Sequence, residues 1–316
     1  MLKRGPMNIV VVGSLNMDLV VRMPRIPKPG ETLLGGVFKT FPGGKGANQA
    51  VAIARLGAHV TMIGCVGDDS FGQEMRASLA REAIDTTPVL VAPGEATGVA
   101  LIQVDAQGQN SIAVASGANF RLTGAAVEKA MQSLEAFDAL VMPLETPLET
   151  IETAARLAVS RGAKVLLNPA PAQVLKKDLL ELVDVLLPNE HELALMTGMA
   201  LQSGAEVRLA ANRLLSLGPK NLLVTLGSQG AVLFNEKMSQ GMSIPAWPVE
   251  TVDTTAAGDC FVGALAVGLC EGKSLPEAAE FASAAAAISV TRPGAQPSLP
   301  RREEVEQFMK ERKQSK

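Results

Sequence analysis

The stretch ALVMPLETPLETIETAARLAVSRGAKVLL, residues 139–167, shows most clearly how this chain folds. Residues 139–142 are a short apolar run typical of a buried strand, 148–161 have the spacing of an amphipathic helix, and 164–167 are apolar again. A strand that is reached through a helix returns to the sheet parallel to the preceding strand. The segment therefore predicts one strand-helix-strand unit of a parallel sheet.

The same alternation continues toward the C-terminus. Short apolar runs predict strands at 185–187 and 222–225, and longer periodic or Ala-rich segments predict helices at 191–197, 206–217, about 256–271, about 276–289 and 301–316. The Ala-rich segments have small residues on every face, as expected of helices that pack closely on a sheet. We expect an α/β fold with a mostly parallel sheet flanked by helices.

Two stretches of the N-terminal third break this rhythm. Residues 17–41 and 95–115 partly alternate apolar and polar side chains in short runs that are separated by Pro, Gly or Asn. This pattern permits a small β lid, inserted in a single domain that we expect to span residues 7–316. Residues 1–6 are then an N-terminal extension, and the sequence leaves open whether the chain starts at Met1 or Met7.

The composition argues against several classes of protein. The chain has 316 residues, 47% of them hydrophobic, and can therefore enclose one large core. Its formal net charge is -3, and Lys and Arg form no block outside the C-terminal tail, which argues against a nucleic-acid partner. The three cysteines lie far from any C-x-x-C spacing and are predicted to be reduced and structural. The apolar run at 9–12 is too short for a signal sequence and no stretch is long enough to span a membrane, so we expect a cytoplasmic location and no membrane partner.

The sequence DTTAAGD, residues 253–259, follows a strand-like stretch at 248–252 and opens the helix predicted at about 256–271. Small residues at a helix start leave backbone N–H groups open, and these groups attract a phosphoryl group together with the helix dipole. Phosphoryl transfer also needs a carboxylate that accepts the proton of the attacking hydroxyl, and Asp259 suits that role. The motif alone equally allows Asp259 to do no more than complement the helix dipole.

A second glycine-rich motif, PGGKGANQA, occupies residues 42–50. Gly43 and Gly44 allow a close backbone approach to a ligand, and the amide of Asn48 can donate and accept toward a polyol. This is not a nucleotide-binding P-loop, because Lys45 is followed by Gly46 where that loop has Ser or Thr.

Three further polar residues are candidates for sugar binding. Asn16 and Asp18 follow the strand-like apolar run at 9–12, and a carboxylate can accept two hydroxyl hydrogen bonds from a vicinal diol. Glu145 follows a strand at the edge where ligands of open α/β sheets collect. Taken alone, Asn16 and Asp18 also fit a turn that satisfies its own backbone, and Glu145 also fits an ordinary loop acid.

Together, the two motifs resemble the paired signatures of the phosphofructokinase-B family of carbohydrate kinases. Segments in the same order extend the resemblance over nearly the whole chain: GSLNMD at 13–18, LE at 144–145, NPAP at 168–171, PNEHE at 188–192, TLGSQG at 225–230 and GAQPS at 294–298. The resemblance implies a three-layer α/β fold with a small β-sheet lid, and ATP-dependent phosphorylation of D-ribose at O5. It further implies Mg²⁺ bound with ATP, activation by K⁺ or a similar monovalent cation, and a homodimer formed through the lid.

The resemblance also implies the site residues. Asp259 is then the general base, and Ala256, Ala257 and Gly258 form the anion hole. The sugar is contacted by Asn16, Met17, Asp18, Gly44, Lys45, Gly46, Asn48, Glu145 and Asp259. ATP is contacted by Asn189, Glu192, Thr225, Leu226, Gly227, Ser228, Gly230, Gly258 and Ser283. The monovalent cation lies near Asp253, Thr255, Ser289, Arg292, Gly294 and Ser298, mostly through backbone carbonyls.

Four of these positions carry a further interpretation. Asn189 and Glu192 also have the spacing of a helix capping box, and both roles can hold together. Ser283 stands where the family often has Asn or His near the adenine, which leaves nucleotide selectivity open. Met17 is larger than the residue common at its position, so it either favours a pentose that lacks one hydroxyl or packs into the lid.

The sequence leaves three alternative functions. A kinase of the same fold could act on 2-deoxyribose, another sugar or a nucleoside. A nicotinamide-dependent oxidoreductase fits poorly, because residues 13–16 lack the G-x-G-x-x-G fingerprint. A sugar-binding regulator without catalysis is opposed by the intact Asp259, Gly258 and Lys45.

Overall fold

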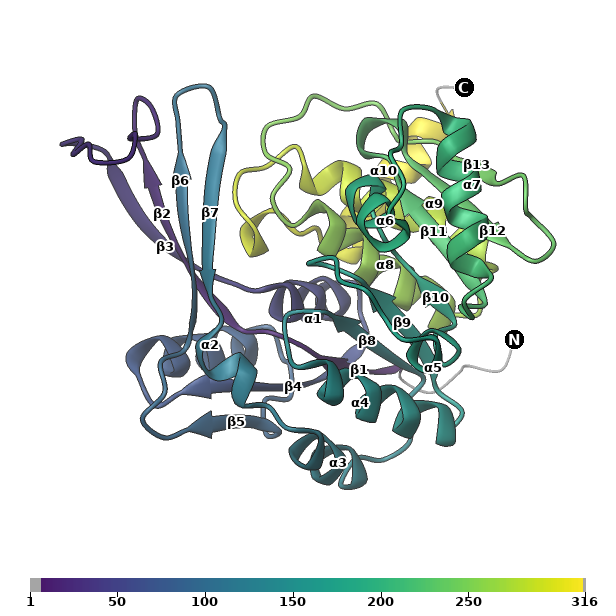
Figure 1. Ribbon diagram of the computed structural model, residues 1–316, viewed down its shortest axis with the longest axis horizontal. Helices are drawn as coiled ribbons and strands as arrows, with labels where there is room; N and C mark the ends of the chain where they lie inside the picture. Colours follow the sequence, from purple (N-terminus) through teal and green to yellow (C-terminus); the bar gives the residue numbers. More distant parts are fainter. Residues whose placement is uncertain (1–6, 315–316) are drawn as a thin grey trace.

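The computed structural model describes residues 7–314 and is shown in Figure 1, so the extension predicted at residues 1–6 lies outside the described residues. Its centre is a nine-stranded sheet with the order β13-β12-β11-β10-β9-β8-β1-β4-β5 among the residues described. The strands are β1 (Asn8–Val12), β4 (His59–Gly67), β5 (Val89–Ala92), β8 (Ala139–Pro143), β9 (Lys164–Asn168), β10 (Val185–Leu186), β11 (Asn221–Thr225), β12 (Ala231–Asn235) and β13 (Met242–Ile244). Only the pairings of β12 with β11 and with β13 are antiparallel within this sheet as described, which confirms the mostly parallel sheet.

Helices cover both faces of this sheet and so make three layers (Figure 1). One face packs on α1 (Lys45–Arg55), α2 (Ser70–Arg81), α8 (Ala257–Cys270), α9 (Leu275–Ser289) and α10 (Arg302–Gln314). The other face packs on α3 (Gly124–Gln132), α4 (Leu148–Ser160), α5 (Lys177–Leu180), α6 (Glu190–Thr197) and α7 (Gly204–Leu215). Along β1, Ile9 and Val11 join the first core while Val10 and Val12 join the second, as the alternation of side chains in a strand requires.

The elements predicted in the C-terminal half are confirmed with shifts of one or two residues at their ends, except that the last two residues of the helix predicted at 301–316 lie outside the described residues. The prediction of a strand at 248–252 is wrong, because these residues are irregular in the structure. Pro245 and Pro248 cannot donate a ladder hydrogen bond, and the N–H of Val252 instead donates to the carbonyl of Val290, 2.8 Å away.

A separate four-stranded sheet extends from the body, at the upper left of Figure 1, with the order β3-β2-β6-β7. Its strands are β2 (Asn16–Arg22), β3 (Val37–Gly43), β6 (Gly98–Val104) and β7 (Asn110–Ala115). They come from the two stretches that break the α/β rhythm. Several apolar side chains of this sheet are exposed, among them Phe38, Leu101, Ile112 and Val114.

The parallel order decides where polar side chains meet. Because β1, β8, β9 and β11 run in the same direction, the residues that follow them gather at one edge of the sheet, next to the first turns of α1 and α8. The described part of the chain also has three short 3-10 turns, η1 (Gly117–Arg121), η2 (Gly227–Gln229) and η3 (Gln296–Ser298). The cysteines are free and buried. Over residues 7–314, no helix is both long and apolar enough to cross a membrane.

Candidate active site

A cavity of about 220 Å³ lies at this edge of the sheet. It is lined by residues from the starts of α1 and α8, from the ends of β9 and β11, and from the start of α6: Lys45, Asn168, Ala170, Leu187, Asn189, Glu192, Thr225, Thr254, Ala256, Ala257, Gly258, Asp259, Phe261 and Val262. The structure therefore brings predicted base, anion-hole, sugar and nucleotide residues to one place.

Asp259 lies in the first turn of α8 and is buried. The side-chain amide of Asn48 donates to its Oδ2 at 3.0 Å, and the amide of Gln49 donates to its Oδ1 at 2.9 Å. Burial raises the pKa of the Asp259 carboxyl, while Lys45 and the two amide donors act in the opposite direction. The carboxylate is thus held in one orientation at the cavity wall.

The start of α8 has an unusual backbone. Ala256 has φ 59, in the left-handed region, and within residues 7–314 no side chain caps this helix. The N–H of Ala257 contacts the carbonyl of Thr254 at 3.2 Å, whereas Gly258 is exposed beside the cavity. Since the first N–H groups of a helix have no partner within it, the first turn can offer donors to an anion.

Lys45 is the only cationic side chain on the described cavity wall. Burial alone would lower its pKa, but the carboxylates of Asp259, Glu145, Glu192 and Asp18 outweigh burial and raise it. Lys45 is therefore a fixed positive charge among four acids. Such a charge is suited to an incoming phosphate or to hydroxyl oxygens.

The glycines of the motif at 42–50 lie against residues 14–18 of the same chain, at distances that leave no room for a side chain. A Cβ at Gly46 would lie 2.6 Å from the backbone nitrogen of Ser14, and a Cβ at Gly43 would lie 2.3 Å from Oδ2 of Asp18. Gly44 has φ 88, and its Cβ would lie 2.7 Å from the nitrogen of Asn16. These contacts bring the loop after β1 against the start of α1, while the approach of this backbone to a ligand stays a prediction.

Asp18 and Glu145 stand beside Lys45. Asp18 is buried, and burial together with Glu145 and Asp259 raises its pKa from 3.8 to about 7. Glu145 accepts hydrogen bonds from the hydroxyl of Ser14 and, at 3.2 Å, from the N–H of Lys45. The group combines acids with a single cation, which suits a ligand rich in hydroxyl donors.

Asn16 and Asp18 point to the same side of β2, because they are two residues apart in a strand. Oδ1 of Asn16 accepts a 2.7 Å hydrogen bond from the amide of Asn119, which lies in η1. Met17 points to the opposite side and is buried in the hydrophobic core. The structure therefore does not bring the side chain of Met17 together with its two polar neighbours.

Apart from Gly258, which lines the cavity, and Ser283, the predicted nucleotide residues fall into two groups. Asn189, Glu192 and Thr225 line the cavity, and the capping box is confirmed because Asn189 and Glu192 exchange hydrogen bonds of 2.8 Å at the start of α6. Burial raises the pKa of Glu192, although the N–H of Asn189 and the charge of Lys45 act in the opposite direction. The turn after β11 carries the second group, Leu226, Gly227, Ser228 and Gly230, outside the lining of the cavity.

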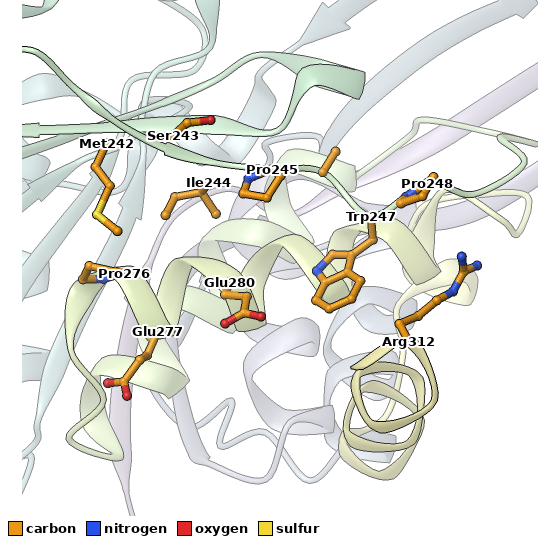
Figure 2. A pocket seen from close by; sticks show the side chains of 11 residues that line it. Met242, Ser243, Ile244, Pro245, Trp247, Pro248, Pro276, Glu277, Glu280 and Arg312 are labelled. Atoms are coloured by element: carbon orange, nitrogen blue, oxygen red, sulfur yellow. The ribbon is translucent and has the colours of Figure 1, made fainter. Parts of the chain in front are cut away.

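A larger cavity of about 500 Å³ lies farther along the same side of the sheet, between β13 and helices α9 and α10 (Figure 2). Its wall is mostly apolar and includes Ile244, Pro245 and Trp247, with Glu280 at the centre of the helical side in Figure 2. Ser283 lies one turn beyond Glu280 on α9, and its hydroxyl donates to the carbonyl of Pro245 at 3.1 Å. Ser283 therefore supports the wall of this cavity.

The residues predicted near a monovalent cation come from two neighbouring loops. Asp253 accepts hydrogen bonds from the N–H and hydroxyl of Thr255 and, at 2.8 Å, from the N–H of Gly294. The hydroxyls of Ser289 and Ser298 donate to backbone carbonyls within their own turns. Arg292 pairs with Glu304. The oxygen atoms that these loops can offer a cation are thus the carboxylate of Asp253 and backbone carbonyls.

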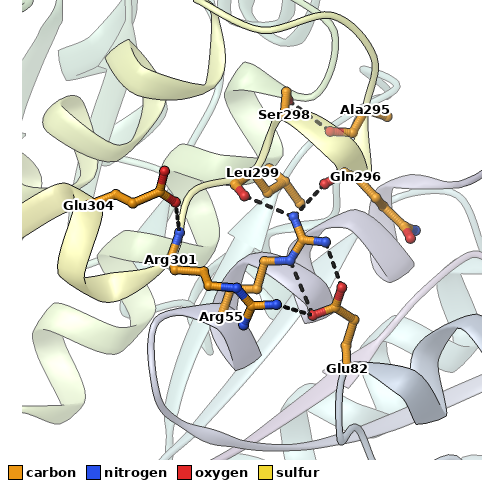
Figure 3. Close-up of polar contacts among 8 residues, drawn as sticks. All are labelled: Arg55, Glu82, Ala295, Gln296, Ser298, Leu299, Arg301 and Glu304. Carbon is orange, nitrogen blue, oxygen red and sulfur yellow. Dashed lines mark hydrogen bonds and ion pairs between the residues drawn. The ribbon is translucent and has the colours of Figure 1, made fainter.

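Arg55, the last residue of α1, connects that helix to the loop at 294–299 (Figure 3). Its Nη1 donates to the carbonyls of Gln296 at 2.6 Å and Leu299 at 2.8 Å, while its other donors bind the carboxylate of Glu82. Arg301 approaches the same carboxylate at 4.0 Å. One guanidinium therefore fixes the loop at 294–299 relative to the helix that carries Lys45 and Asn48.

Sequence reasoning missed four polar residues of the site. Ser14, Gln49 and Asn119 contact predicted site residues, and Asn168 contacts Gln49 and lines the cavity. Gln49 could have been suspected, because it follows Asn48 on a glycine-rich helix start and is a polar residue in an apolar run. Asn119 has no such signal, since its partners Leu15 and Asn16 are more than 100 positions away.

The sequence matches the family described as "pfkB family carbohydrate kinase" over residues 7–302. A ribokinase of Haemophilus influenzae is 45% identical over 301 residues, which cover 95% of this chain and 98% of the relative. A deoxyribokinase of Salmonella typhi is 38% identical over 304 residues, which cover 96% of this chain and 99% of the relative.

Among solved structures, the ribokinase of Arabidopsis thaliana complexed with ribose and ATP is similar to this chain with a TM-score of 0.88 and 33% identity. The match covers 97% of this chain and 99% of that one. The likeness confirms the predicted three-layer α/β fold with a small separate sheet.

Proposed function

Because the chain belongs to the pfkB family of carbohydrate kinases, we propose that it transfers the γ-phosphoryl group of ATP to O5 of D-ribose. The observation that carries this proposal is the convergence of Asp259, Lys45 and the first turn of α8 on one cavity. Relatives named ribokinase match nearly the whole chain and are themselves matched over nearly their whole length.

Asp259 is the general base of the transfer. Its carboxylate takes the proton of the 5-hydroxyl as the oxygen of that group attacks the γ-phosphorus. The new bond joins O5 to phosphorus, and the bond from phosphorus to the β,γ-bridging oxygen breaks, so ADP leaves with the electron pair. The raised pKa of Asp259 favours proton uptake, while Asn48 and Gln49 hold the carboxylate toward the cavity.

Negative charge that develops on the transferred phosphoryl group is stabilised by backbone N–H groups and by one lysine. The backbone N–H groups of the first turn of α8, with Gly258 exposed at the cavity, form the anion hole. Lys45 adds a positive charge from the opposite helix. Since both are in place before the substrates arrive, little reorganisation is needed during the reaction.

The sugar lies between the small sheet and the start of α1. Asp18, Asn16, Asn48 and Glu145 hydrogen-bond its hydroxyl groups, and the backbone at 44–46 approaches it beside Lys45. Ribose is preferred to 2-deoxyribose, because the side chain of Met17 points into the core, away from the side of β2 that carries Asn16 and Asp18, and so does not oppose the 2-hydroxyl. The small sheet acts as a lid that excludes water.

ATP extends from the anion hole along the ends of the strands. Its phosphates lie near Thr225, Asn189 and Glu192, and the turn at 226–230 follows its ribose. The apolar cavity of Figure 2 accommodates the adenine, whose amino group can donate to Glu280. The cavity size and its position on the Ser283 face of α9 support this placement.

Two cations fit these residues. Within residues 7–314 no three His, Cys, Asp or Glu side chains are grouped as a metal site, so Mg²⁺ would be held chiefly by ATP, with Glu192 as the nearby hard oxygen donor. A monovalent cation such as K⁺ would lie between the loops at 253–255 and 289–298, where carbonyls and Asp253 offer oxygen atoms. It would supply positive charge beside the loop that opens α8.

The exposed apolar side chains of β3 and β7, at the two edges of the small sheet, support a homodimer formed through the lid. We place this dimer in the cytoplasm, in keeping with the free cysteines.

The activity is tested by incubating the protein with ATP and either D-ribose or 2-deoxyribose, with and without K⁺, and identifying the product by ³¹P NMR. We expect a 5-phosphate, and a kcat/KM for ribose at least about tenfold above that for 2-deoxyribose, because the loss of one buried hydrogen bond costs about that factor. A higher kcat/KM for 2-deoxyribose would favour the alternative kinase, and absence of both products would contradict the proposal.

A further inference from the structure

Gln49 is a fully buried polar side chain in α1 that contacts the proposed base. Its Nε2 donates to Oδ1 of Asp259 at 2.9 Å and to Oδ1 of Asn168 at 3.2 Å. Asn168 in turn donates to the carbonyl of Leu187 at 2.9 Å. The Asp259 carboxylate is therefore connected through two amides to the end of the central sheet.

The two contacts fix the orientation of the Gln49 amide. A side-chain amide has two N–H donors, and both are used here on oxygen acceptors. Rotating the amide by half a turn would place Oε1 against those two oxygens. In the present orientation Oε1 is buried and has no hydrogen-bond partner among residues 7–314. A buried oxygen without a hydrogen-bond partner lowers the free energy of unfolding. The orientation that contacts Asp259 is therefore present although it makes the folded protein less stable.

We propose that Gln49 is a positioning residue that fixes the carboxylate of Asp259 for proton transfer, with Asn168 as the anchor of its amide. This inference rests on the proposed function, because it assigns Asp259 as the base. Gln49 holds Oδ1 while Asn48 holds Oδ2, so the carboxylate cannot rotate without losing two hydrogen bonds. The remaining lone pairs then face the substrate hydroxyl.

A neutral donor is required at this position because of the charges around Asp259. Lys45 on α1 faces the carboxylate, and so do Glu145 after β8, Glu192 on α6 and Asp18 on β2. These acids already favour protonation of their neighbours, and donated hydrogen bonds counteract that effect. A second cation would pair with the acids, whereas an amide stabilises the carboxylate without neutralising it.

The test compares Gln49→Met, which keeps the length of the side chain and removes its donors, with Val51→Ala. Val51 is equally buried on the same helix and is an apolar residue of the hydrophobic core, so it controls for lost stability. For Gln49→Met we expect kcat to fall by about 10- to 100-fold with KM for ribose within about threefold, because binding groups remain. In a plot of kcat against pH, the acidic limb should shift to higher pH by about one unit, because the carboxylate loses one hydrogen bond. Val51→Ala should leave the limb unmoved.

A measurement without substrate separates this inference from the proposed function. At pH 8, Asp259→Asn removes a buried charge, and it should raise the urea midpoint more in the Gln49→Met background than in the wild type. Wild type that fails to phosphorylate ribose while this coupling is present would overturn the proposed function only. An equal effect of Asp259→Asn in both backgrounds, or an unmoved pH limb in Gln49→Met, would overturn the role of Gln49.

Discussion

The amide of Asn48 and the carboxylate of Asp259 are 211 positions apart in the chain and are joined by a 3.0 Å hydrogen bond. Asn48 belongs to the first turns of α1 and Asp259 to the first turn of α8, and α1 packs directly on α8. The helix that carries the sugar-binding motif and the helix that carries the anion hole are thereby held in one geometry. The predictions below follow from this shared arrangement.

Replacing Asp259 by Asn should lower kcat by about 10²- to 10⁴-fold, the range expected for a lost general base. Ribose binding should persist, because the amide keeps the size of the side chain and other residues bind the sugar. Turnover is measured from ADP release and binding by calorimetry. Near-normal turnover in this variant would remove Asp259 as the base.

Replacing Asp18 by Asn should stabilise the free protein above pH 7 and weaken ribose binding. The pKa of Asp18 is raised from 3.8 to about 7 in the folded state, so the folded state binds the proton more tightly than the unfolded state. Its contribution to stability is therefore present at low pH and lost as pH rises between these two values. The difference of about 3 between the folded and unfolded pKa values lowers the free energy of unfolding by at most about 4 kcal/mol at pH 8.

Urea unfolding at pH 4.5, where most of this contribution remains, and at pH 8, about one unit above the folded-state pKa, measures this difference. The stabilisation by Asp18→Asn should be larger at pH 8. Asp178→Asn, at an exposed acid in the first turn of α5, is the control and should change the free energy of unfolding by less than about 0.5 kcal/mol at either pH. A pH-independent effect of Asp18→Asn would show that its charge is not suppressed by burial.

Replacing Arg55 by Ala should lower the free energy of unfolding by about 3–5 kcal/mol, because it leaves Glu82 and two backbone carbonyls without their partner. Arg55→Lys should recover only part of the loss, since an ammonium cannot reproduce the planar set of donors. The activation by K⁺ should also weaken, because the loop at 294–299 loses its support.

Arg81→Ala is the matched control for Arg55. Arg81 pairs with Glu74 on the surface, where both side chains are at least half exposed, so the loss should be below about 1 kcal/mol. Chemical unfolding and turnover at several K⁺ concentrations distinguish the two. Equal losses in both variants would contradict a structural role for the Arg55 network.

Replacing Glu280 by Gln should reduce the preference for ATP over GTP by about tenfold, because the 6-oxo group of guanine would no longer face a carboxylate. Ser283→Ala should change KM for ATP by less than about threefold, since the hydroxyl of Ser283 already donates to Pro245. Both are measured from initial rates with each nucleotide. An unchanged preference in Glu280→Gln would place the base outside the cavity of Figure 2.

Local sequence decided the elements and their class. The apolar run at 139–142, the helical spacing at 148–161 and the apolar run at 164–167 became β8, α4 and β9, because side-chain periodicity is a property of neighbouring residues. The motif at 253–259 likewise predicted a helix start with a carboxylate in its first turn. The stretch at 248–252 failed, since its apolar side chains could not compensate for the missing donors of two prolines nearby.

Only the tertiary structure decided which polar groups meet. The contacts of Asp259 with Gln49, of Asn16 with Asn119 and of Arg55 with the loop at 294–299 each join residues more than 100 positions apart. It also decided that Met17 points into the core and that Gly43, Gly44 and Gly46 have no room for a Cβ, because the side chain of Asp18 and the backbone of residues 13–16 lie against them. Such contacts depend on how helices and strands pack, which local propensity does not encode, so the sequence determined the chemical groups available and the packing determined their partners.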